Sequence, residues 1–114
     1  MSDCVFCKIV NKEIPSTVVY EDERVIAFKD IEPAAPTHIL VIPKRHIANI
    51  ADPNLLQEGL ATDLMQAIQK VTQELGLREN GFRVVVNYGR DALESVHHLH
   101  FHVIAGRSMS WPPG

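Results

Sequence analysis

The sequence predicts an α+β fold with a mainly antiparallel sheet, one long helix and a short N-terminal helix. The evidence is the order of the patterns along the chain. Runs rich in β-formers precede a long segment with helical periodicity, and two further β-rich runs follow it. Such an order places the long helix on one face of the sheet. The 114 residues suit one domain spanning 1–114.

The first half of the chain predicts a short helix and three strands. The helix covers 6–11 and ends before Pro15. Residues 17–20 and 25–28 are rich in β-branched and aromatic side chains and flank an acidic turn, which is typical of a hairpin. The strongly apolar run 38–42 suits a central strand.

The long helix is predicted from its start, its stripe and its end. Asp52 suits the N-cap, Pro53 the first helical position and Gly76 the residue after the helix. Apolar residues at helical spacing predict one buried stripe of Leu56, Leu60, Leu64, Ile68, Val71 and Leu75.

The last two predicted strands cover 82–87 and 96–104, with a loop over 88–94 between them. The final strand carries His98, His100 and His102 in alternation. Side chains two apart on a strand share a face, so these imidazoles should lie roughly 7 Å apart on one face. Leu99, Phe101 and Val103 should face a core, and His97, out of phase with the three, should not be catalytic.

The composition argues against several classes of partner. The net charge is −3 and no Lys/Arg block occurs, which argues against nucleic acid. No apolar stretch approaches the ~18 residues of a membrane span, and no secretory signal is apparent. We therefore expect a cytoplasmic protein without membrane contact. In that reducing setting Cys4 and Cys7 favour metal or redox chemistry over a structural disulfide.

The three alternating histidines indicate a metal site, a nucleophile site, or both. Imidazoles are poor core material, and they titrate near neutrality, where proton transfer is easiest. The CxxC of Cys4 and Cys7 is, by itself, equally consistent with metal, redox chemistry or chance.

These residues resemble a known family. The run from His98 to Ile104 is similar to the signature of the histidine triad (HIT) superfamily of nucleotide hydrolases and transferases. Further segments resemble its branch of histidine triad nucleotide-binding proteins, and the similarity covers essentially the whole chain. Those segments are Lys8–Pro15, Phe28–Ile31, Ala35–His38, Val41–Ile47 and Ser110–Gly114.

The resemblance implies a HIT-like fold with a five-stranded antiparallel sheet, in a homodimer whose subunits share a larger sheet. It also implies a purine nucleoside phosphoramidase that hydrolyses adenosine 5′-monophosphoramidates to AMP and an amine.

The resemblance also assigns the catalytic positions. His100 would be the nucleophile and form a nucleotidyl-imidazole intermediate, its other ring nitrogen donating to a backbone carbonyl. His102 would donate to the phosphate oxygens, with His98 completing the triad. Ser95 could relay a proton to the leaving amine, and Asn87 would touch the phosphate. Both are also ordinary turn residues.

Other family positions would bind the rest of the nucleotide. Asp30 would accept from both ribose hydroxyls, and Phe28 and Ile31 would line the base pocket, although each could equally be plain core. Trp111 would lie in a tail that approaches the partner's active site. We expect His38, which also matches a family histidine, to be a buried structural residue.

Zinc is the cofactor that the sequence favours. Thiolates and imidazoles at four positions make a tetrahedral site. The superfamily's zinc-bearing members imply Cys4, Cys7, His46 and His98 as ligands, in a closed structural site that would orient His100. The alternative is two packed cysteines without metal.

The loop before the histidines departs from the family pattern of two glycines and a glutamine. Here it carries Ala92, Leu93 and Glu94, and the carboxylate of Glu94 could repel an anionic substrate. Two alternatives to the phosphoramidase therefore stay open. One is a nucleotide-binding regulator with weak or no catalysis. The other is a dinucleoside polyphosphate hydrolase, against which the tail at 110–114 argues.

Overall fold

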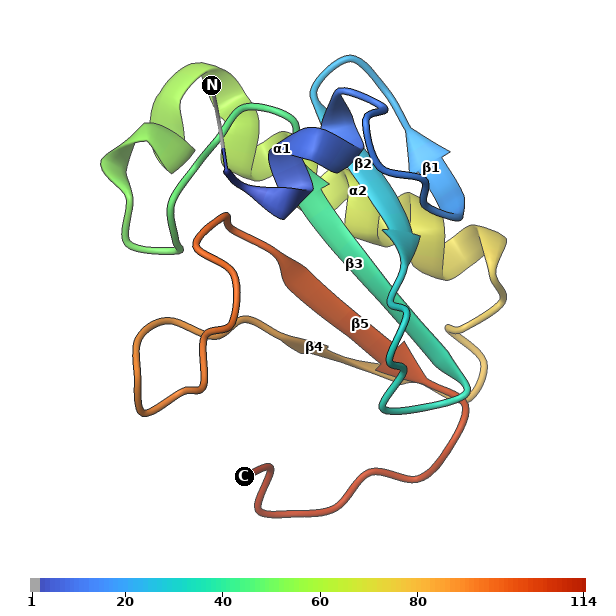
Figure 1. The fold of residues 1–114 in the computed structure, drawn as a ribbon. Coiled ribbons are helices and arrows are strands. Elements are labelled where there is room, and N and C mark those ends of the chain that lie inside the picture. The colour runs from blue at the N-terminus through green and yellow to red at the C-terminus, as the bar shows by residue number, and fades with distance from the viewer. Residues whose placement is uncertain (1–2) are drawn as a thin grey trace.

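A five-stranded antiparallel sheet forms the centre of the molecule (Figure 1). The structure is a computed structural model and describes residues 3–114. The strand order across the sheet is β1-β2-β3-β5-β4, and this arrangement confirms the predicted fold class. The strands are β1 (Val18–Glu21), β2 (Val25–Lys29), β3 (Thr37–Pro43), β4 (Phe82–Val85) and β5 (Phe101–Ala105).

The long helix α2 (Leu60–Glu74) covers one face of the sheet (Figure 1). Strand residues facing it alternate with residues facing the other way, as the period of two requires. The resulting core is made of Val25, Ala27, Ile39, Val41, Phe101 and Val103 from the strands and Leu60, Leu64, Ala67, Ile68 and Val71 from α2.

The short helix α1 (Val5–Val10) packs on the opposite face. Its Phe6 and Ile9 are buried against a second cluster that the sheet supplies. The strand members of that cluster are Ile26, Phe28, Leu40 and Ile42, which are the alternate residues of β2 and β3. Leu40 is paired with His102 in the β3–β5 register, so His102 also lies on the α1 face.

The helical segment differs from the prediction of one continuous helix. Residues Pro53–Gly59 form a 3₁₀ segment, capped by Asp52 as predicted, and α2 starts only at Leu60. The backbone leaves helical geometry between them, where Glu58 and Gly59 have φ of 55° and 72°. This break turns Leu56 outward, 77% exposed, so its place in the predicted stripe is wrong. Leu75, the C-cap of α2, is 43% exposed, so its place in the predicted buried stripe is also wrong.

The histidine strand is shorter than predicted. β5 begins at Phe101, and the Leu99 N–H bonds to the Ile47 carbonyl at 2.7 Å, outside the β3–β5 ladder. Leu99 is buried in the α2-side core, as expected. His97, by contrast, is exposed to solvent.

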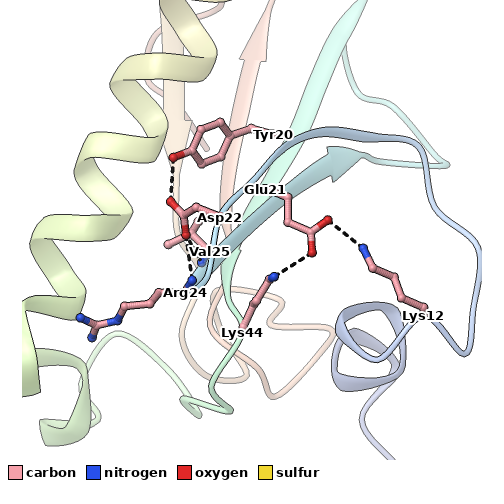
Figure 2. Close-up of polar contacts among 7 residues, drawn as sticks. All are labelled: Lys12, Tyr20, Glu21, Asp22, Arg24, Val25 and Lys44. Carbon is pink, nitrogen blue, oxygen red and sulfur yellow. Dashed lines mark hydrogen bonds and ion pairs between the residues drawn. The ribbon is translucent and has the colours of Figure 1, made fainter.

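Polar contacts tie the end of α1 to the sheet (Figure 2). Glu21, at the end of β1, accepts from Lys12 at 2.8 Å and from Lys44 at 2.7 Å. In the turn that follows, Asp22 accepts from the backbone N–H groups of Arg24 and Val25, both at 2.8 Å. Glu21 therefore anchors the segment after α1 beside the β1–β2 hairpin.

Candidate functional site

A pocket of about 300 Å³ lies between α1 and the sheet. Its apolar side is formed by Val5, Phe6, Ile9, Ile14, Phe28 and Leu40, and its polar end by Asp30, Ser95, His100 and His102. A pocket with an apolar slot and a few converging polar groups is typical of a small-molecule site. The four polar residues come from three separate stretches of the chain, which the β2–β3–β5 arrangement brings together.

The hydrogen bonding of His100 selects one tautomer of its ring. The His100 Nδ1–H donates to the backbone carbonyl of His98 at 2.7 Å, and the ring is 4% exposed. In a neutral imidazole the other nitrogen then carries a lone pair. In its neutral form, His100 therefore carries its lone pair on Nε2 in the wall of the pocket, which is the arrangement that a nucleophile requires.

His102 is oriented by a chain of hydrogen bonds that starts in the loop before β3. The Ala34 N–H donates to His38 Nδ1 at 2.9 Å, so neutral His38 carries its hydrogen on Nε2. That Nε2–H donates to His102 Nδ1 at 2.9 Å. Burial, and then the neighbouring His100 and His38 rings, lower the pKa of His102 to about 4. His102 is thus held neutral, with its hydrogen on Nε2.

Asp30 lies beside the hydrogen bonds that join Ala34, His38 and His102. One of its oxygens accepts from the Glu32 N–H at 2.8 Å, and the other lies 3.5 Å from His38 Nε2. Potential ligand atoms of Asp30, His38 and His102 lie within 4.8 Å of one another. Metal binding at His38 Nε2 would move its hydrogen to Nδ1, directly opposite the Ala34 N–H donor. This group therefore suits hydrogen bonding rather than a metal.

In the loop before the histidines, the side chain of Glu94 accepts a hydrogen bond from the loop's own backbone. Glu94 Oε1 accepts from the Gly89 N–H at 3.0 Å and lies 3.4 Å from His97 Nδ1. Only 6% of the Glu94 side chain is exposed. Leu93 adopts a φ of 60°, a left-handed conformation that its side chain disfavours. Ser95, which lines the pocket, therefore directly follows a turn that is closed by the buried side chain of Glu94.

A second cluster joins α1 to the segments flanking β3 and β5. Cys4 Sγ lies 3.3 Å from His98 Nδ1, and Cys7 Sγ lies 3.3 Å from His46 Nδ1. All four ligand atoms lie within 4.8 Å of one another. Zn–S and Zn–N bonds of about 2.3 and 2.1 Å separate tetrahedral neighbours by roughly 3.6 Å. The predicted ligand set therefore comes together at spacings that fit zinc.

The outer contact of His98 supports the same conclusion. Its Nε2–H donates to the Pro43 carbonyl at 2.8 Å, which leaves the Nδ1 lone pair directed at the two sulfurs. Backbone carbonyls hold metal-ligating histidines in this way in many proteins. Burial lowers the pKa of His98 to about 4, so the ring stays neutral as a ligand must.

The other predicted binding residues divide into two groups. Phe28 and Ile31 both line the pocket, although Ile31 is 94% exposed. Asn87 and Trp111 are not among its lining residues. Trp111 is 82% exposed, and its ring lies 5.9 Å from the guanidinium of Arg83 in β4.

The sequence analysis missed two residues of the site. His38 is buried as expected, but it also orients His102. Phe6 lies between the two cysteines and packs edge-on against His100, with ring centres 5.1 Å apart. The signal for His38 was its place in the central strand, in phase with Leu40 and Ile42. The signal for Phe6 was its position as an aromatic residue between the two cysteines of the CxxC motif.

Comparisons with known proteins agree with this geometry. Residues 11–109 match the HIT domain family. The chain is 48% identical over 115 residues to the 14 kDa zinc-binding protein of Zea mays, covering 99% of this chain and 89% of that protein.

Two solved structures share the fold. A HIT family hydrolase from Legionella pneumophila has 47% identity and a TM-score of 0.93, with 98% of this chain and 100% of that chain covered. A HIT family hydrolase from Clostridium thermocellum has 49% identity and a TM-score of 0.90, with 96% of each chain covered. The chain therefore belongs to the HIT family.

Proposed function

We propose that this protein is a hydrolase that cleaves the P–N bond of purine nucleoside 5′-monophosphoramidates, such as those of adenosine. The observation that carries the proposal is the His100 Nδ1–H bond to the His98 carbonyl, which leaves Nε2 as an unprotonated nucleophile in the pocket. The solved relatives named HIT family hydrolases support the reaction class.

The reaction proceeds in two displacements at phosphorus. His100 Nε2 attacks, a P–N bond to the ring forms, and the bond to the amine breaks while the amine takes a proton relayed by Ser95. Water then attacks phosphorus, the P–N bond to the ring breaks, and the proton lost by the water restores the Ser95 hydroxyl. The nucleoside monophosphate and the neutral His100 ring are released. His102 Nε2–H donates to the phosphate oxygens throughout, an interaction that strengthens as charge develops there.

The rest of the pocket suits a nucleoside. Phe28, Leu40 and Phe6 provide an apolar slot for the base, and Asp30 offers carboxylate oxygens to the ribose hydroxyls at the polar end. Base contacts of this kind accept either purine.

Zinc binds at Cys4, Cys7, His46 and His98 in this proposal. The fit of the ligand spacings and the name of the maize relative support it. With four protein ligands the metal has a structural role, so the chemistry remains with His100.

The protein acts as a homodimer joined along β4. This strand is at the edge of the sheet, and its Phe82 and Val84 are 39% and 41% exposed. Edge strands with apolar side chains are ready to pair with another chain. Pairing there would join two sheets and bring the Trp111 tail, which lies against Arg83, to the interface.

The test is hydrolysis of a fluorogenic adenosine phosphoramidate by the wild type, by His100→Ala and by His97→Ala. Turnover that is lost in His100→Ala and kept in His97→Ala, an exposed histidine three positions away, supports the proposal. AMP binding without turnover would instead indicate a nucleotide-binding regulator. Selective cleavage of diadenosine polyphosphates would indicate the alternative hydrolase.

A further inference from the structure

We propose that zinc occupancy of the Cys4–Cys7–His46–His98 cluster controls nucleotide affinity in the adjacent pocket, with Phe6 as the positioning residue that carries the effect. This inference rests on the proposed function, because it takes the pocket to be a nucleotide site. It goes further by making the metal a determinant of substrate binding rather than of folding alone.

The first turn of α1 belongs to both sites at once. Cys4 caps the helix and Cys7 lies three residues on, so both sulfurs reach the metal cluster. The two residues between them, Val5 and Phe6, line the nucleotide pocket. A movement of the ligands therefore moves one wall of the pocket.

Phe6 occupies the contact point between the pocket and the nucleophile. Its ring packs edge-on against His100 at 5.1 Å and against Phe28 at 5.7 Å, measured between ring centres. It is 7% exposed, so it has little room to adjust independently of the backbone. A shift of the α1 first turn would change both the base slot and the packing of the His100 ring.

His98 provides a second connection between the two sites. Its Nδ1 faces the cysteine sulfurs, while its own carbonyl accepts the hydrogen of His100 Nδ1. The residue that ligates the metal thus also selects the tautomer of the nucleophile. Loss of the metal would remove the tether on His98 Nδ1 and leave the ring held by Nε2 alone, through its bond to the Pro43 carbonyl. The His98 carbonyl that orients His100 would then be held less firmly.

The two ends of α1 are anchored differently. The segment after the helix is held through Lys12, which donates to Glu21 at 2.8 Å, and Glu21 is itself fixed by Lys44 at 2.7 Å. The first turn is tied to the sheet by the ligand cluster and by the packing of Phe6. Metal removal should therefore displace the first turn while the rest of the helix stays docked, which changes affinity without unfolding the protein.

The test is AMP binding, measured by titration calorimetry, to zinc-loaded protein and to protein freed of metal by chelation and dialysis. We expect metal-free protein to bind AMP about tenfold more weakly, within the usual range of coupling between sites, and zinc to restore the affinity. Because coupling is reciprocal, saturating AMP should raise the affinity for zinc by the same factor. Equal AMP affinity with and without zinc would overturn the inference.

A variant separates positioning from metal loss. Phe6→Leu in the zinc-loaded protein should weaken AMP binding while keeping one zinc per chain. Lys8→Ala on the same helix, outside both the cluster and the pocket lining, should change neither quantity. If circular dichroism shows that the metal-free protein is unfolded, the inference is tested by the Phe6→Leu variant alone. Unchanged AMP affinity in that variant then overturns the inference.

The two proposals fail in different ways. Zinc-loaded wild type that binds no AMP would remove the proposed function and this inference together. AMP binding that is indifferent to zinc and to Phe6 would remove only the inference.

Discussion

His38 and His102 share a hydrogen bond of 2.9 Å between Nε2 and Nδ1, and the Ala34 N–H decides its direction. Because Ala34 donates to His38 Nδ1, His38 donates to His102, and His102 presents its own Nε2–H. A backbone amide thus selects, through two rings, which nitrogen of His102 can donate to a phosphate.

Replacing His38 should therefore impair turnover through His102. His38→Ala leaves His102 free to adopt either tautomer, and a hydrogen bond to a charged group contributes about 1.5–3 kcal/mol. We expect kcat to fall about 10- to 100-fold with a smaller change in KM. His38→Gln, whose amide can still donate, should recover part of the loss. Unchanged kcat in His38→Ala would contradict the orienting role of His38 towards His102.

The stability of the protein should fall on mild acidification. Burial lowers the pKa of both His38 and His102, the latter to about 4, whereas the unfolded chain titrates near 6.5. Between these values the unfolded state binds more protons, so the free energy of unfolding rises with pH. The stabilisation is complete above about pH 6.5 and is lost as the pH falls towards 4.

Urea denaturation at pH 7 and pH 5 measures this dependence. The midpoint should drop in the wild type, and the drop should be smaller in His102→Gln. His97→Gln changes an exposed side chain and should keep the wild-type drop. An identical drop in His102→Gln would show that other groups cause the effect.

Glu94 should limit activity on substrates with neutral leaving groups. Its carboxylate is buried beside Ser95 and holds the Gly89 N–H. Glu94→Gln keeps an oxygen for Gly89 and removes the charge, so kcat/KM on a neutral-amine phosphoramidate should rise. Glu94→Leu removes the acceptor as well and should lower activity by releasing the loop. A fall in kcat/KM for Glu94→Gln would mean that the charge itself is useful.

The proposed dimer depends on the β4 edge. Val84→Arg places a charge among the exposed apolar side chains of that strand and should give monomers in size-exclusion chromatography with light scattering. Val18→Arg is the matched control, since Val18 is 39% exposed on β1 at the opposite edge. A dimer that survives Val84→Arg would place the interface elsewhere.

Local patterns were sufficient to predict the fold class. The stripe of Leu60, Leu64, Ile68 and Val71 is buried as its spacing required, and Gly76 follows the helix with a φ of 68°. The HIT resemblance is confirmed by the family match and the solved relatives.

Errors arose where a local signal fits two structures equally well or where a distant contact overrides local preference. Asp52 and Pro53 start a 3₁₀ segment as readily as an α-helix, so the break at Glu58 and Gly59 was hidden by the continuing apolar period. Leu99 leaves the ladder because its N–H bonds to Ile47, more than fifty positions earlier in the chain.

The structure placed the metal ligands together as the resemblance implied, but the roles of His38 and Phe6 depend on strand register and helix placement. His102 faces Leu40, so His38 is its diagonal neighbour on the same face. No local pattern specifies which residues of two separate strands face one another. The catalytic and nucleotide-binding roles themselves stay predictions until they are assayed.

The ligand cluster joins Cys4 to His98, which are 94 positions apart in the chain. During synthesis at about 5–20 residues per second, the wall of the pocket emerges from the ribosome several seconds before the residue that completes its anchor. The four-ligand site is therefore completed late, since its last ligand, His98, lies just before β5. Cellular zinc supply should therefore affect the final maturation of the protein and leave the early stages of its folding unchanged.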